Sequence, residues 1–362
     1  MKTVNQSIVS LAALLAAALF INNAQADSFT LGSLVVVRVG DGTTTLASSG
    51  GPLSVLEIST AGSLLQPAIT VPSGSSGLQI SGTATSEGQL VLNADGQSFT
   101  IAGYVPPYGG SGSLSGRSAA NAPRGFVTIG YTGVVSPTTT LPSAPYSAQN
   151  IRSGFNSGSG AWFAGSGTGS GSGLVYDNGA TSSTIQGVNS RVLDYYNGNL
   201  YFSTGSGTQG IYQYPGTPTS ATSASAFLTG ITGQGSSPYD FVFSPDGNSL
   251  YVADDAIGVQ KFTFNGSVWT LAYNFTDSAS ANKAYGLAVD FAQPNPVLYW
   301  TSPTDLWSAT DLGVAAAGTS VASAGANYAF RGLEIVPEPS TFALTGIGLA
   351  LLLKFRRAPR KI

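Results

Sequence analysis

Residues 240–253 read DFVFSPDGNSLYVA, and this stretch decides the fold. Two apolar and aromatic runs of strand length flank Ser244–Gly247, where Pro presets the turn and Asp-Gly closes a hairpin. Two further runs, Val259–Phe264 and Val268–Phe275, follow after short polar turns. Four antiparallel strands within about 40 residues are typical of one blade of a β-propeller.

Similar units recur along the chain. Tyr201, Tyr251 and Tyr299 stand at matching places in apolar runs, at steps of 50 and 48 residues. Other β-branched and aromatic runs are bounded by Gly, Ser, Pro, Asn and Asp, and residues 27–336 show no helical period. A repeat of about 40–50 residues predicts six to eight blades, with seven as the central value. The expected fold class is therefore all-β, a β-propeller of about seven four-stranded blades.

Residues 243–253 resemble a repeat of the seven-bladed propellers of the lactonase and surface-layer type. The resemblance is strong over this blade and weak elsewhere, and residues 27–120 match poorly. They form either divergent blades of one propeller, which we favour, or a separate small β-sandwich. An isolated run at Phe330–Ile335 predicts how the ring closes, by completing a blade begun near Leu31–Val39.

The first 26 residues have the pattern of a secretory signal peptide. Lys2 precedes an apolar run from Ile8 to Ile21, and Ala24-Gln25-Ala26 forms a small-x-small cleavage site before Asp27. The alternative is a buried N-terminal helix. We expect an N-terminal signal helix at residues 1–26, cleavage by signal peptidase, and export of the body at residues 27–336 across the inner membrane.

The last 26 residues, 337–362, have three parts in sequence. Pro337-Glu338-Pro339 comes first, and an apolar run from Phe342 to Leu353 follows. The basic tail contains Lys354, Arg356, Arg357 and Arg360, which hold that end in the cytoplasm. The run is shorter than the ~20 residues of a stable membrane span. We therefore expect a short transmembrane helix that anchors the chain in the membrane only temporarily.

This three-part end resembles a PEP-CTERM sorting signal. The resemblance implies a bacterium with two membranes and an exosortase that cleaves near Pro337-Glu338-Pro339. It also implies a transient inner-membrane anchor, followed by release or by attachment at the cell surface. Proteins with such a signal usually accompany the production of exopolysaccharide. The alternative is a simple C-terminal membrane anchor, which also leaves the body outside.

Composition excludes several kinds of chemistry. The chain has no His and no Cys, so Ser-His-Asp triads, Cys nucleophiles, zinc sites of the His/Cys kind and disulfides are ruled out. Residues 27–336 carry eight basic and 16 acidic residues, a net charge of −8. An acidic, sparsely charged body argues against nucleic acid as a partner and is compatible with divalent cations or neutral glycans.

Asp254 and Asp255 are the only metal candidates, and weak ones. With Asp240 and Asp246 of the same blade they could offer oxygen atoms to Ca²⁺. No EF-hand-type loop is present, and aspartates at hairpin turns more often cap the turn. We expect no other cofactor, and the sequence identifies no catalytic residue.

Two further features have two interpretations each. Ser153–Gly173, with eight Gly and six Ser, is a flexible loop over one face or a disordered linker or long blade loop, and Trp162-Phe163 inside it predicts a strand. The Trp and Tyr residues pack between blades or stack on sugars. The three Glu of the body match no glycosidase motif.

The favoured function is an exported, exosortase-processed propeller that binds or builds in the exopolysaccharide matrix or at the cell surface, with exopolysaccharide or other surface proteins as partners. The alternative is a propeller lactonase or hydrolase, whose acid–base chemistry would rest on Arg and carboxylates because His is absent. Arg, Asp and Asn converging at the centre of the ring favour an enzyme or small-ligand site. A centre filled by Gly, Ser and apolar groups, with aromatics exposed on a loop face, favours glycan or protein binding.

Overall fold

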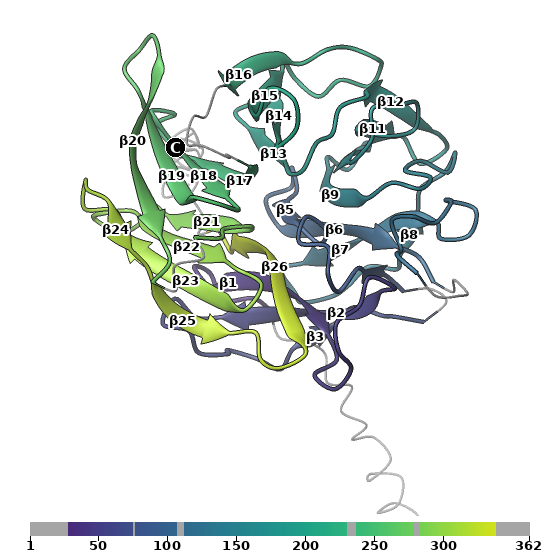
Figure 1. The fold of residues 1–362 in the computed structure, drawn as a ribbon, viewed down its shortest axis with the longest axis horizontal. Coiled ribbons are helices and arrows are strands. Elements are labelled where there is room, and N and C mark those ends of the chain that lie inside the picture. Colours follow the sequence, from purple (N-terminus) through teal and green to yellow (C-terminus); the bar gives the residue numbers. More distant parts are fainter. Residues whose placement is uncertain (1–27, 75–76, 107–111, 230–236, 279–281, 338–362) are drawn as a thin grey trace, which may run out of the picture.

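The computed structural model describes residues 28–74, 77–106, 112–229, 237–278 and 282–337. All regular elements in these ranges are strands, and their sheets are arranged around a common centre (Figure 1). No helix with the length and apolar character needed to cross a membrane is found among these residues. The expected signal helix at residues 1–26 and the hydrophobic helix after Pro337 lie outside the described ranges.

Four sheets are separate antiparallel units whose strands follow one another in chain order. The first is β9(Ile151–Asn156), β10(Ala161–Gly165), β11(Leu174–Asp177) and β12(Ser182–Gln186). The second is β13(Leu193–Tyr196), β14(Asn199–Thr204), β15(Gly210–Tyr214) and β16(Ser225–Thr229). The third is β17(Pro238–Phe243), β18(Ser249–Asp254), β19(Gly258–Phe264) and β20(Trp269–Thr276), with β24(Ala316–Ala317) added in parallel. The fourth is β21(Leu287–Asp290), β22(Val297–Thr301), β23(Asp305–Thr310) and β25(Thr319–Ser323).

A nine-stranded sheet holds two more groups of four strands, joined through the short β4(Gln79–Ile80). One group is β26(Tyr328–Ile335), β1(Leu34–Gly40), β2(Gly51–Ile58) and β3(Ile69–Thr70). The other is β5(Leu90–Leu92), β6(Ser98–Tyr104), β7(Arg124–Gly130) and β8(Thr139–Thr140).

The all-β propeller arrangement is confirmed, whereas seven blades are not. The described residues contain six four-stranded units. The physical reason lies in the repeat length, because the steps of 48 and 50 residues between Tyr201, Tyr251 and Tyr299 lie at the long end of the expected range. A longer repeat places fewer blades in the same length of chain.

The ring closes as the isolated run at Phe330–Ile335 predicts. Strand β26 pairs antiparallel with β1, with Leu34 opposite Ile335 and Val39 opposite Ala329. The backbone N–H of Gly32 also donates to the carbonyl oxygen of Val336 (2.9 Å). The last described strand is therefore the innermost strand of the unit that the first strand begins, and the predicted closure is confirmed.

Alternation along each strand binds neighbouring units together. Successive residues of a strand point to opposite faces of the sheet. In β18, Tyr251 and Ala253 belong to the apolar cluster shared with the unit β21–β25, while Leu250 and Val252 belong to the cluster shared with the unit β13–β16. Every unit is thus buried on both faces, which explains why runs such as SLYVA are apolar on both sides.

The Gly- and Ser-rich segment 153–173 is part of a blade, so its interpretation as a disordered linker is wrong, whereas residues 157–160 and 166–173 lie outside the strands and fit a blade loop. It contributes β9 and β10, and the strand predicted at Trp162-Phe163 is confirmed. Glycine is required there by close packing. A Cβ at Gly154 would lie 2.7 Å from the ring of Phe163, and one at Gly165 would lie 2.3 Å from the carbonyl oxygen of Asn150.

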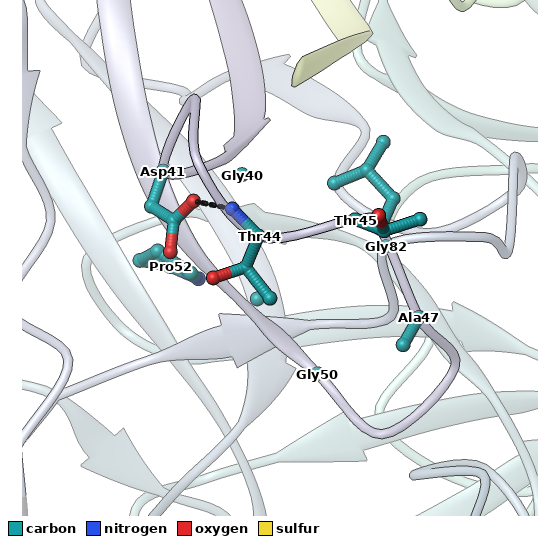
Figure 2. A pocket seen from close by; sticks show the side chains of 10 residues that line it. Gly40, Asp41, Thr44, Thr45, Ala47, Gly50, Pro52 and Gly82 are labelled. Carbon is teal, nitrogen blue, oxygen red and sulfur yellow. Dashed lines mark hydrogen bonds between the residues drawn. The ribbon is translucent and has the colours of Figure 1, made fainter. Parts of the chain in front are cut away.

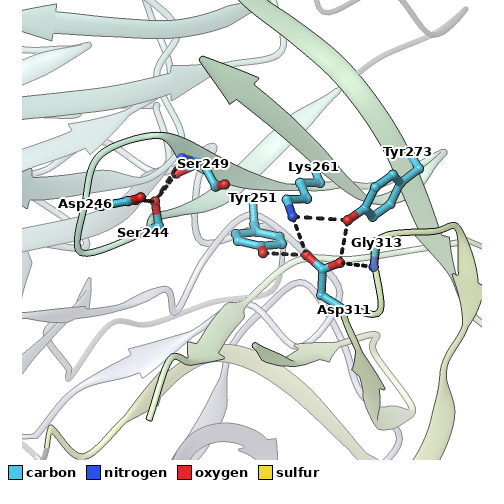
Figure 3. Close-up of polar contacts among 8 residues, drawn as sticks. All are labelled: Ser244, Asp246, Ser249, Tyr251, Lys261, Tyr273, Asp311 and Gly313. Carbon is cyan, nitrogen blue, oxygen red and sulfur yellow. Dashed lines mark hydrogen bonds and ion pairs between the residues drawn. The ribbon is translucent and has the colours of Figure 1, made fainter. Parts of the chain in front are cut away.

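A polar network joins the units β17–β20 and β21–β25 (Figure 3). Asp311, one residue after β23, forms an ion pair with Lys261 Nζ (2.7 Å) and accepts hydrogen bonds from the hydroxyls of Tyr251 and Tyr273. The Asp311 side chain is 2% exposed, and its other contact is the N–H of Gly313 (3.0 Å). Three strands of one unit are thereby tied to the end of a strand in the next.

Candidate functional site

Three arginines lie in or just before inner strands, at the centre of the ring. The innermost strands of the six units are β26, β5, β9, β13, β17 and β21, and each contacts the next around the centre (Figure 1). Arg152 is the second residue of β9, Arg191 stands two residues before β13, and Arg331 lies within β26. The topology therefore gathers three of the eight cations of an acidic body at one place.

Each of these arginines reaches the chain that leads into the next inner strand. Arg152 Nη1 donates to Asn189 Oδ1 (2.6 Å) and Arg191 Nη1 donates to Ser237 Oγ (2.6 Å). Arg331 Nη2 donates to the carbonyl oxygen of Gly82 (2.8 Å). Neutral acceptors thus fix the guanidinium groups, and none of these contacts is with a carboxylate.

Two tyrosines complete what we call the axial cluster, defined as Arg152, Arg191, Arg331, Tyr239 and Tyr285. The guanidinium carbon of Arg191 lies 4.1 Å from the ring centre of Tyr239. The rings of Tyr239 and Tyr285 meet edge to face, with centres 4.7 Å apart. The Tyr239 hydroxyl lies 3.1 Å from the hydroxyl of Thr85. The cluster is consequently rigid and combines cations with aromatic faces.

The axial cluster carries a positive charge that no contacting carboxylate balances. Among the described residues, none of its three arginines has a carboxylate oxygen within 4.0 Å. Burial and the neighbouring charge of Arg191 together lower the pKa of Arg152 to about 10. Burial also lowers the pKa of Arg331 to about 10, against the attraction of Glu87. Guanidinium groups with these values stay charged at neutral pH.

Glu87 is the nearest buried acid, and the fold already uses it. Its carboxylate is fully buried and accepts hydrogen bonds from the Ser81 N–H (2.8 Å), the Tyr104 hydroxyl (2.8 Å) and Asn150 Nδ2 (2.6 Å). Burial raises the pKa of Glu87 against these three hydrogen bonds. Glu87 therefore has a structural role and offers no free oxygen to a ligand.

The cluster has both solvent access and unused hydrogen-bonding groups. Arg152 and Arg191 are partly exposed, whereas Arg331 and both tyrosines are buried. Within the described part of the chain, Nε of Arg152 and of Arg331 has no hydrogen-bond partner, and neither does either side-chain amide atom of the buried Gln89. The backbone N–H of Gln89 donates to the carbonyl oxygen of Arg152 (3.2 Å). Unpartnered polar groups of this kind are uncommon in folded proteins and fit a site that a polar ligand completes.

Acidic residues lie farther along the same inner strands. Glu334 follows Arg331 in β26, Asp194 follows Arg191, and Asp240 is the third residue of β17. Burial raises the pKa of all three carboxyls, and that of Asp194 rises to about 6. The ring centre thus has a cationic part and, farther along the inner strands, an acidic part.

The calcium candidates take different positions. Asp254 accepts the N–H of Ser237 (2.6 Å) and of Ala256 (2.9 Å), so it caps the turn. Asp246 lies at the opposite end of β18 from Asp254, and six residues of strand separate them by about 20 Å. No group of three or more acidic residues placed to hold a metal ion occurs in the part of the chain that the structure describes. Calcium at Asp254 and Asp255 stays a prediction.

Asp255 is the candidate that does approach the axial cluster. It is partly exposed, and burial raises its pKa, while the charge of Arg191, the hydroxyl of Ser237 and the charge of Lys283 oppose the rise. A carboxylate with a raised pKa beside a guanidinium group can accept a proton next to a stabilised negative charge. The structure thus gives Asp255 a place that the sequence did not indicate.

A hollow at Gly40, Gly50 and Gly82, of about 70 Å³, is shown in Figure 2. Its only charged group, Asp41, accepts the N–H of Thr44 (2.7 Å) through Oδ1, and hydrogen bonds from Thr44 and Thr43 lower the pKa of its carboxyl. The hollow is small and its carboxylate stabilises a turn, so the axial cluster is the better candidate site.

Of the other predicted site residues, Ala24, Ala26, Asp27 and the tail from Glu338 onward lie outside the described residues. Pro337 is described and follows the buried Val336. Trp162, Trp300 and Trp307 are buried, as expected for packing between units. The sequence did not single out the three arginines, although each stands at or just before an inner strand.

No family model matches the chain, and no curated protein does either. Solved structures with a similar fold include a Bacteroides uniformis protein provisionally described as a 6-phosphogluconolactonase (15% identity, TM-score 0.43, 82% of this chain and 83% of that one). Another is the periplasmic gluconolactonase PpgL of Pseudomonas aeruginosa (16% identity, TM-score 0.44, 76% of this chain and 78% of that one). A third is a functionally unknown protein from Desulfotomaculum acetoxidans (15% identity, TM-score 0.42, 86% of this chain and 92% of that one). At these values the likenesses assign no function to the chain.

Proposed function

We propose that the axial cluster binds a small polyhydroxylated anion of the sugar-acid class. The observation that carries this proposal is the convergence of Arg152, Arg191 and Arg331 without a contacting carboxylate, in a body of net charge −8. Guanidinium groups are well suited to carboxylates because they donate two parallel hydrogen bonds. This arrangement meets the criterion of polar groups converging at the centre of the ring, which favours a small-ligand site.

The rest of the cluster suits the remainder of such a ligand. Amide and hydroxyl groups at Asn189, Ser237 and Thr85 can exchange hydrogen bonds with sugar hydroxyls. The ring of Tyr239 offers an apolar face beside the cations. Because each guanidinium is already fixed by neutral acceptors, binding costs little side-chain ordering.

Replacing Arg191 by Gln is expected to weaken gluconate binding at least tenfold in calorimetric titration, since a charged hydrogen-bond partner contributes about 1.5–3 kcal/mol. Glucose, which lacks the carboxylate, should bind more weakly than gluconate to the unaltered protein. Arg38→Gln, a change in β1 away from the axial cluster, is the matched control and should leave gluconate affinity unchanged. Equal binding of glucose and gluconate would contradict the proposal.

Lactone hydrolysis is a second candidate, favoured by the proximity of Asp255 to Arg191. Water would attack the lactone carbonyl while Asp255 takes its proton, and Arg191 would stabilise the oxyanion. Collapse of the tetrahedral intermediate would break the bond to the ring oxygen, and Asp255 would return its proton to that oxygen, which leaves as a hydroxyl of the acid product. Asp255→Asn should then abolish enzyme-dependent ring opening of gluconolactone in a pH-stat while gluconate binding persists. Activity that survives Asp255→Asn would exclude this role.

We also propose that the protein works outside the cell, in the exopolysaccharide matrix or at the surface, after processing by signal peptidase and an exosortase. Sequence patterns at both ends support this proposal, and uronic acids in a polysaccharide carry the same carboxylate and hydroxyl groups as the proposed ligand. Replacing Pro337-Glu338-Pro339 by alanines should trap the full-length chain in the inner membrane, as seen by fractionation and immunoblot. Normal release of that variant would contradict the sorting proposal.

A further inference from the structure

A hollow of about 210 Å³ lies where the unit β26-β1-β2-β3 meets the unit β21–β25, and none of its lining residues belongs to the axial cluster. Its walls are apolar and come from both units: Leu56, Ile58, Leu64, Ala68, Ala322 and Phe330. Leu64 is 55% exposed and lies at the rim. A concave apolar surface with few polar groups is the usual form of a small-molecule site.

One charged side chain, Arg38, lines this apolar hollow. By the alternation of β1, Arg38 lies on the same face as Leu34 and Val36, which pack in the apolar cluster between the two units. A cation thus ends a row of apolar residues, in a place where packing alone would favour another aliphatic side chain.

The Arg38 guanidinium is held but not neutralised. Its Nε donates to Ser54 Oγ (3.2 Å) and its carbon lies 3.9 Å from the ring centre of Tyr328. Among the described residues, no carboxylate oxygen lies within 4.0 Å, and both Nη groups lack a protein partner. The Tyr328 ring and Ser54 fix the plane of the group and leave its two Nη donors for another acceptor.

The loop between β2 and β3 fixes the shape of the hollow. A Cβ on Gly62 would lie 1.9 Å from the carbonyl oxygen of Val321, so the loop can approach β25 only because residue 62 is glycine. This contact holds Leu64 at the rim while the rest of the side chains form the floor. The hollow is therefore a built feature of the junction between the two units.

We propose that this hollow binds a short amphipathic carboxylate, a medium-chain fatty acid in chemical class. The acyl chain packs against the apolar walls, and the carboxylate accepts hydrogen bonds from the Nη groups of Arg38. Charge complementarity selects this occupant, because a neutral apolar ligand would leave Arg38 unpaired in an apolar site and a small polar anion would leave the walls empty.

Titration of the purified protein with octanoate, below its micellar concentration, tests the proposal by calorimetry. Octanoate should bind at least tenfold more tightly than octan-1-ol, which lacks the charge, and than acetate, which lacks the chain. Arg38→Gln should remove the preference for octanoate over octan-1-ol. Arg191→Gln, a change in the axial cluster, should leave octanoate affinity unchanged, so this proposal and the sugar-acid proposal fail separately.

A surface variant covers the case in which Arg38→Gln fails to fold. Leu64→Glu places a carboxylate at the exposed rim and should weaken octanoate binding at least tenfold by repulsion. Val268→Glu is the matched control, because Val268 is 54% exposed and lies on the distant β20 hairpin. Equal octanoate affinity of both variants, or equal binding of octanoate and octan-1-ol to the unaltered protein, would overturn the proposal.

Octanoate should also raise the melting temperature, because the hollow joins the unit that closes the ring to its neighbour and a ligand of the folded state stabilises it. The rise should saturate with octanoate concentration and be absent in Leu64→Glu. A rise of the same size in Leu64→Glu would show that octanoate acts elsewhere and would overturn the assignment to this hollow.

Discussion

Deleting residues 328–336 is expected to unfold the whole ring rather than one blade. Strand β26 is the innermost strand of the first unit, and it contacts the inner strands β5 and β21 of both neighbouring units. Phe330 and Leu333 are fully buried in the cluster between the first and last units. Removing the strand would leave β1 as an open edge and expose two apolar clusters at once.

The measurement is thermal unfolding followed by circular dichroism, and the expected result is loss of a cooperative transition or an insoluble product. Leu333→Ala should lower the free energy of unfolding by about 2–5 kcal/mol through the cavity it leaves. Leu312→Ala is the control, because Leu312 is 67% exposed, and the expected change is within about 0.5 kcal/mol. A deletion variant that melts at the temperature of the full chain would show that β26 does not close the ring.

Strand positions were predictable where a tight turn and a long apolar run coincide. The hairpin at Ser244–Gly247 is an example, and its flanking strands begin and end within two residues of the predicted limits. Residues 153–173 resisted prediction because their glycines make close contacts with rings and carbonyl groups of neighbouring strands and loops, such as Phe163 and Asn150. A Gly-rich composition suggests a flexible segment. Only the structure shows that these positions require glycine because a Cβ would collide with the packed neighbours.

The axial cluster could not be predicted because its members come from separate units. Arg152, Arg191 and Arg331 lie 39 or more residues apart, and only the circular arrangement brings them together. Asp255 drew attention as a possible calcium ligand, whereas its neighbour in the structure is a cation, Arg191.

Replacing Asp311 by Ala is expected to lower the free energy of unfolding by about 3 kcal/mol or more, because it leaves Lys261 without its counter-charge. The Lys261 side chain is 16% exposed, and its remaining partner is the Tyr273 hydroxyl (3.1 Å). Urea unfolding at pH 7 measures the effect. Asp305→Ala is the matched control, because Asp305 begins β23, is less buried and accepts a hydrogen bond from Ser320 Oγ (3.0 Å); it should cost about 1 kcal/mol or less.

The same network predicts how the effect of Asp311→Ala depends on pH. Burial raises the pKa of the Asp311 carboxyl, but hydrogen bonds from Lys261, Tyr251 and Tyr273 outweigh it, so the pKa is lowered overall. A lowered carboxyl pKa stabilises the fold above the unfolded value of about 3.9, and this contribution is lost as the pH falls through the folded value. The difference in stability between the unaltered protein and Asp311→Ala should therefore shrink below about pH 4.

At alkaline pH, the direction in which this stability difference changes depends on Lys261. Burial lowers the pKa of its amine, but the hydrogen bonds that the amine donates to Asp311 and Tyr273 outweigh this, so the pKa is raised overall. That contribution is complete below the unfolded value of about 10.4 and is lost as the pH rises through the folded value. Urea unfolding at pH 3, 7 and 11 should consequently give its largest difference between the two proteins at pH 7. A difference that stays constant across this range would mean that Asp311 stabilises the junction by packing alone and not through its charge.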